Sequence, residues 1–162
     1  MVFDIANFIG AIASANDIAF SADKAIFGFK RKATEFLKKE VARNAEDFEF
    51  DKPLPNQKNG VRFSAVQRRG NVVSVVNFVS GSTSTNFVNS LCRSKANIEI
   101  AREQRDADFS IGLCAILYDD NILNHFSSGM AQEYLDHLRR KEDEGYSVFP
   151  WVQRNSLQRL LA

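Results

Sequence analysis

The clearest pattern in the chain is a stripe of apolar residues at helical spacing between residues 21 and 41. Its members recur every three or four positions, and Ser21 precedes them as an N-cap residue. A weaker pattern between Val2 and Ile18 predicts an earlier helix with a bend at Gly10. The stripe consists of Ala25, Ile26, Phe29, Ala33, Phe36, Leu37 and Val41.

Apolar residues then alternate with polar ones, which is the period of a β-strand. A first short strand around residues 48–50 ends before Pro53. A second begins near residue 61, and the Gly70-Asn71 pair predicts a hairpin turn into a third strand over residues 72–79. The third strand is apolar on both faces, so we expect it to be central.

The remaining elements are a capped helix, a buried strand, another helix and an extended end. Residues 80–85 are rich in capping residues and open a helix that either runs to Arg105 or ends before a short strand at Ile98 and Ile100. Residues 109–118 predict a buried strand parallel to the third one. A helix near residues 130–138 leads to an extended segment, 146–152, and a short terminal helix.

This order predicts an α/β fold, close to α+β, in one domain spanning residues 1–162. We expect a mixed central sheet of about four to five strands with an αβββαβ-like core, N-terminal helices and a C-terminal helix. Residues 1–20 would be an N-terminal helical segment, 21–145 the core, and 146–162 the C-terminal extension. A chain of 162 residues that is 44% hydrophobic can bury such a core.

The order of helix, three strands, helix and strand resembles the core of PD-(D/E)xK nucleases. In that family a central strand carries an acid and a lysine two residues apart. The strand at 72–79 offers only Ser74 and Asn77 as polar side chains, and no Asp or Glu in the chain is followed two positions later by Lys. The resemblance therefore implies a core without that catalytic machinery.

Composition limits the cellular compartments and the classes of binding partner that we expect for this protein. The net charge of +1 gives no overall attraction for nucleic acid or membranes, so such binding needs a local cluster of charge. Cys92 and Cys114 lie in apolar surroundings and predict buried free thiols, which suit a reducing compartment. No apolar run approaches the roughly 20 residues of a membrane span, so we expect a cytoplasmic protein without membrane contact.

Three groups of polar residues are candidate sites, each with an ordinary structural alternative. The Gly81, Ser82, Thr83 and Ser84 loop could hold an anion at a helix N-terminus, or simply cap that helix. Alternation would place three acids on one strand face, where they could hold a metal or form a solvated edge. These acids are Asp47, Glu49 and Asp51.

Basic residues form the third group, and they lie on the helix after Ser21 and around the hairpin. Together they could bind phosphates, although solvated faces would show the same pattern. They are Lys30, Arg31, Lys38 and Lys39 on the helix, with Arg68 and Arg69 at the hairpin. Separately, Phe149 and Trp151 flank Pro150 and predict either a partner-binding edge or a strand covering the core.

No nucleophile, general base or metal cluster has a diagnostic spacing, so we expect neither catalytic residues nor a cofactor. The leading hypothesis is a non-catalytic binding or regulatory protein with a protein partner, contacted through the strand acids, Phe149 and Trp151. The alternative is a nucleic-acid-binding or metal-dependent nuclease-like protein that uses the basic helix and the strand carboxylates. Self-association through the helix before Phe20 is a further hypothesis.

Overall fold

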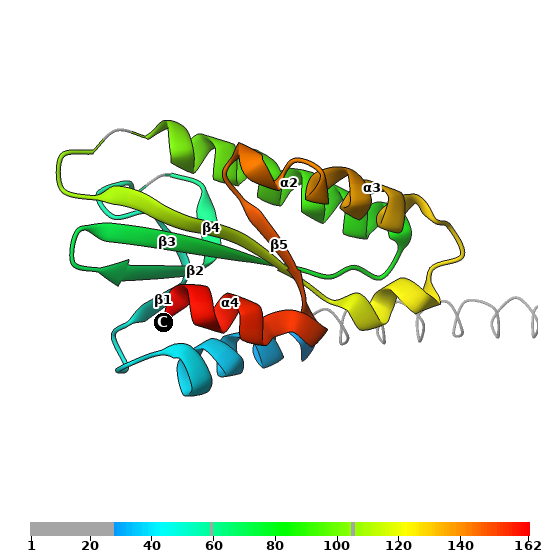
Figure 1. Cartoon of the computed structure of the whole chain (residues 1–162), viewed down its shortest axis with the longest axis horizontal. Helices are drawn as coiled ribbons and strands as arrows, with labels where there is room; N and C mark the ends of the chain where they lie inside the picture. The colour runs from blue at the N-terminus through cyan, green and yellow to red at the C-terminus, as the bar shows by residue number, and fades with distance from the viewer. Residues whose placement is uncertain (1–27, 59, 105) are drawn as a thin grey trace, which may run out of the picture.

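The computed structural model describes residues 28–58, 60–104 and 106–162, so the helix expected before Phe20 lies outside the described residues. These residues form one five-stranded mixed sheet with helices on both faces (Figure 1). The predicted single-domain α/β fold is confirmed. The strands, which are neighbours in sequence order, are β1 (Phe48–Pro53), β2 (Arg62–Arg69), β3 (Val72–Val79), β4 (Ser110–Tyr118) and β5 (Ser147–Pro150).

The direction of each strand follows from its connection. Strands β1, β2 and β3 are antiparallel neighbours, and the β2–β3 turn uses Gly70 at φ 62°, as the sequence predicts. Strands β3, β4 and β5 are parallel, because α2 (Ser84–Glu103) and α3 (Met130–Arg139) carry the chain back between them. The αβββαβ order is therefore confirmed, with α3, β5 and α4 (Arg154–Leu161) appended.

Two buried clusters occupy opposite faces of the sheet. Val73, Val75 and Val79 of β3 pack with α2 and α3, whereas Val76 packs with the other helical layer. That second layer contains a helix at residues 28–36, which continues into the π-helical turn η1 (Leu37–Val41), and α4 (Arg154–Leu161). Figure 1 shows the two layers above and below the sheet.

Several sequence alternatives are resolved by the described residues. Helix α2 continues through Ile98 and Ile100 to Glu103, so no strand forms there. Strand β5 lies at the edge of the sheet. Pro150 is tolerated there, because an edge strand can include a residue that has no N–H to donate. Cys114 is buried as expected, but Cys92 is exposed on α2. Three short 3₁₀ segments complete the described part of the chain: η2 (Asp120–His125), η3 (Glu142–Glu144) and η4 (Trp151–Gln153).

None of the helices within the described ranges is both long enough and apolar enough to cross a membrane.

Candidate functional site

The helical layer below the sheet is built from two amphipathic segments that bury one face each. Phe29, Ala33 and Phe36 of the helix at 28–36 are almost fully buried against the sheet. From α4, Leu157 and Leu161 are buried in the same cluster. Because the inward faces are apolar, the polar residues of both segments are directed to the outer surface.

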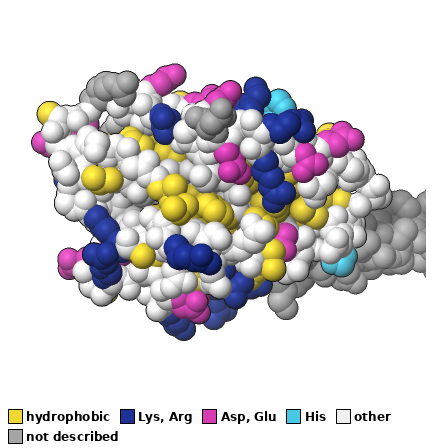
Figure 2. All heavy atoms as spheres, viewed as in Figure 1, with side chains coloured by type: hydrophobic (Ala, Val, Ile, Leu, Met, Phe, Trp, Pro, Cys, Tyr) yellow, Lys and Arg dark blue, Asp and Glu magenta, His cyan; other side chains and the backbone are white. Residues whose placement is uncertain are grey.

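This outer surface has a large excess of positive over negative charge. Residues 28–43 and 151–162 contain eight basic and two acidic residues, a net charge of +6. Since the whole chain has a net charge of +1, the other residues together carry −5. We call this surface the basic layer, and Figure 2 shows dark blue side chains gathered along its lower edge. Its basic residues are Lys30, Arg31, Lys32, Lys38, Lys39, Arg43, Arg154 and Arg159.

Buried aromatic rings hold several of these cations in place. Trp151 is 9% exposed and packs edge-on against Phe29 and Phe36, with ring centroids 5.9 and 5.6 Å apart. The Lys32 Nζ lies 4.6 Å from the Trp151 ring centroid, and the Arg154 Cζ lies 4.5 Å from it. Such cation–π contacts restrain long side chains that would otherwise move freely. Trp151 is thus a core residue that positions two charges at the surface.

A shallow groove of about 230 Å³ runs over these rings, between the N-terminal helix and α4. Lys32, Lys39 and Arg154 line it, together with Glu35 and Glu40. Glu35 pairs with Lys39 at 2.8 Å, and a hydrogen bond from that ammonium lowers the pKa of Glu35. The lining of the groove therefore combines positively and negatively charged side chains.

Asp47 links the basic helix to the basic hairpin. Its carboxylate accepts hydrogen bonds from Arg69 at 3.3 and 3.0 Å and from the main-chain N–H of Arg43 at 3.2 Å. Burial opposes ionisation of Asp47, but the hydrogen bonds from Arg69 and Arg43 outweigh it and hold its pKa below the usual value. Of the two basic groups predicted from sequence, only the hairpin's Arg69 reaches the end of the basic helix in this way, and Asp47 neutralises it.

The three strand acids do not share a face. Asp47 contacts Gln67, whose amide also donates to the Leu161 carbonyl, so its carboxylate lies on the α4 side. Glu49 is exposed opposite Val66, on the α2 side. Asp51 is exposed too, and its φ of 54° breaks the alternation that the sequence analysis assumed. Across the described ranges, no group of three or more His, Cys, Asp or Glu residues could hold a metal ion.

The remaining predicted residues have mainly structural contacts. Thr83 is the N-cap of α2, and its hydroxyl accepts from the Asn86 N–H at 3.1 Å. Beside this loop, the Asp119 carboxylate accepts from Ser80 at 3.2 Å and adds a negative charge where an anion was expected. Phe149 is partly buried in the lower cluster, next to Trp151. Arg68 is exposed at the hairpin and donates to the Gly70 carbonyl.

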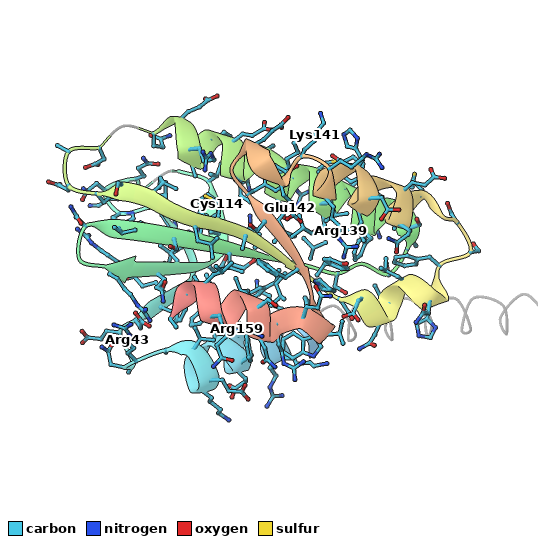
Figure 3. The ribbon with its side chains drawn as sticks, viewed as in Figure 1. Arg43, Cys114, Arg139, Lys141, Glu142 and Arg159 are labelled. Atoms are coloured by element: carbon cyan, nitrogen blue, oxygen red, sulfur yellow. The ribbon has the colours of Figure 1, made fainter. Side chains whose placement is uncertain are left out.

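Sequence reasoning missed two features of the site. Arg154 and Arg159 join the basic layer only because α4 folds back beside the N-terminal helix, and Figure 3 places Arg159 in the same layer as Arg43. The other feature is a polar pair between β2 and β3: the Ser64 N–H donates to Asn77 Oδ1 at 3.1 Å, and the Phe78 N–H donates to Ser64 Oγ at 3.0 Å. Asn77 was visible in the sequence only as a polar residue in an apolar strand.

Comparison of the chain with protein-family models, with curated proteins and with solved structures gives no match in any of the three.

Proposed function

We propose that this protein is a binding domain without a catalytic role, and that it holds nucleic acid by its phosphates on the basic layer. The observation that carries this proposal is the charge of +6 over residues 28–43 and 151–162 in a chain whose net charge is +1. Lysine and arginine side chains that neutralise phosphates release condensed counterions, which drives binding without base recognition.

The arrangement of the cations supports this assignment. Lys30, Arg31, Lys38 and Lys39 are exposed, and Lys38 lies 5.2 Å from the ring centroid of Phe50 at the β1 side. Towards α4, the ring of Trp151 positions Lys32 and Arg154. Positive charge therefore extends across the layer from β1 to α4, and restrained side chains lose less entropy on binding.

The same geometry argues for binding rather than metal-dependent cleavage. Of the three strand acids, Asp47 already accepts hydrogen bonds from Arg69, Gln67 and the Arg43 N–H. A carboxylate engaged in this way is a poor ligand for a divalent cation, because metal binding would break its bonds to a guanidinium.

Charge neutralisation tests the proposal. We expect the double variant Arg31→Gln/Lys38→Gln to bind duplex DNA or RNA of random sequence about tenfold more weakly than the wild type at low salt. The matched control is Arg140→Gln/Lys141→Gln, which removes the same two charges from the opposite layer and should bind within about twofold of the wild type. Fluorescence anisotropy measures both affinities. Equal losses in the two variants would contradict a defined surface.

A protein partner is the second candidate, because the basic layer also exposes apolar side chains. Val152 of η4 is 68% exposed and Leu160 of α4 is 58% exposed. Cations mixed with apolar side chains are a common composition for a protein interface. Salt-resistant capture of one stoichiometric protein, lost in Val152→Asp/Leu160→Asp, would favour this candidate over nucleic acid.

A further inference from the structure

A small polar hollow lies beneath α2, on the face of the sheet opposite the basic layer. Its volume is about 160 Å³, well below the roughly 300–1,000 Å³ of pockets for drug-sized ligands, so only a small ligand fits. Side chains of β2, β3 and α2 line it, with Asp51 at one side. The principal polar lining residues are Asp51, Arg62, Asn77, Ser90, Arg93 and Asn97.

Asn77 supplies a buried donor to this hollow. The residue is 6% exposed, and its Nδ2 is buried and has no hydrogen-bond partner within the described part of the chain. The orientation of the amide is fixed, because Oδ1 accepts the Ser64 N–H at 3.1 Å. Buried polar groups are nearly always satisfied in native proteins, so a donor left over in a polar hollow meets an acceptor from outside the chain, which is either water or a ligand.

The charges around the hollow determine what that acceptor is. Arg62 and Arg93 are exposed at the mouth, and Arg62 donates to the main-chain oxygen of Asp51 at 3.2 Å. The two arginines and the Asp51 carboxylate give the lining a net charge of +1. Hydroxyl and amide donors from Ser90 and Asn97 add to this excess of donors. A compact ligand with several acceptor oxygens and negative charge matches that chemistry.

We propose that this hollow is a binding site for a small phosphate-type oxyanion. The Asn77 Nδ2 donates to it at the inner end, and the Arg62 and Arg93 guanidinium groups hold it at the mouth. Because Arg93 is exposed, its side chain can move aside to admit the ligand. The site is separate from the basic layer, since Asn77 and Val75 lie on the α2 face of β3 whereas the basic layer covers the other face.

Titration with inorganic phosphate, against chloride at equal ionic strength, tests the site by NMR. We expect the Asn77 side-chain NH₂ resonances to shift saturably with phosphate only, and Arg93→Gln to weaken the affinity about tenfold. The control Arg140→Gln removes an exposed arginine at the C-cap of α3 and should leave the affinity unchanged. Resonances that do not move, or equal affinities in Arg93→Gln and the wild type, would overturn the proposal.

A second variant removes the Asn77 Nδ2 donor and leaves the other lining residues of the hollow unchanged. Asn77→Asp retains an oxygen for the Ser64 N–H and replaces Nδ2 by a carboxylate oxygen, so phosphate binding should be lost. If Asn77→Asp does not fold, the Arg93→Gln comparison decides the question alone. Repeating the titration with a nucleoside monophosphate distinguishes the sources of the ligand: tighter binding than inorganic phosphate indicates a phosphate monoester, and weaker binding indicates the free ion.

Discussion

At the scale of single residues, Asp47 differs most from its sequence context. The run from Asp47 to Asp51 reads as one acidic strand face, yet Asp47 is buried and the other two acids are exposed. Its main partner, Arg69, is 22 positions away, so local pattern could not distinguish Asp47 from Glu49. The burial of Trp151 could not be predicted from local pattern either, because it depends on Phe29 and Phe36, which are far away in the sequence.

We expect Asp47→Ala to lower the free energy of unfolding by about 2–3 kcal/mol at neutral pH, because it removes the acceptor for Arg69, Gln67 and the Arg43 N–H. The exposed neighbour provides a control, and Glu49→Ala should change stability by less than about 0.5 kcal/mol. Urea unfolding measures both values.

The same measurement has a defined pH dependence. Since the folded-state pKa of Asp47 lies below its unfolded value, its contribution is complete above about pH 4 and is lost as the pH falls through the folded pKa. The difference between the wild type and Asp47→Ala should therefore shrink below about pH 4. A difference that stays constant to pH 2 would show that the ionised carboxylate is not responsible.

At the scale of elements, most strands and helices could be predicted because their apolar residues recur at regular helical or strand spacing. The hairpin at Gly70, the apolar third strand and the parallel strand ending at Tyr118 follow directly from alternation and turn residues. The end of α2 could not be predicted, since the spacing of Ile98 and Ile100 fits both a helix and a β-strand. Packing settles it: Ile98 is buried on the inward face of the helix, and Ile100 is 42% exposed.

The start of α2 depends on a close approach that only glycine allows. A Cβ on Gly81 would lie 2.6 Å from the Phe87 nitrogen and 2.9 Å from its Cα, both main-chain atoms that cannot rotate away. We expect Gly81→Ala to destabilise the protein by more than about 1 kcal/mol through this strain. Gly129→Ala, whose added Cβ meets nothing within 4 Å, should be nearly neutral. Thermal unfolding compares the two, and similar melting temperatures would contradict the close contact.

At the scale of the whole molecule, the fold gathers basic side chains in one of its two helical layers. The order of the elements was predictable from sequence, but this gathering of charge was not, because α4 reaches the N-terminal helix only through the folded sheet. There the Gln158 side chain donates to the Glu40 carbonyl, 118 positions away in the sequence, at 2.8 Å. A net charge of +1 therefore conceals a strongly basic surface.

The most direct test of this account is the salt dependence of nucleic-acid binding. If the basic layer holds phosphates, a plot of log affinity against log salt concentration should be linear for the wild type, with a slope near −0.9 per neutralised phosphate of a duplex. Arg31→Gln/Lys38→Gln should reduce that slope by up to about 2, because two contacts are removed. Binding that does not change with salt, or an equal slope in the variant, would contradict the assignment of the basic layer.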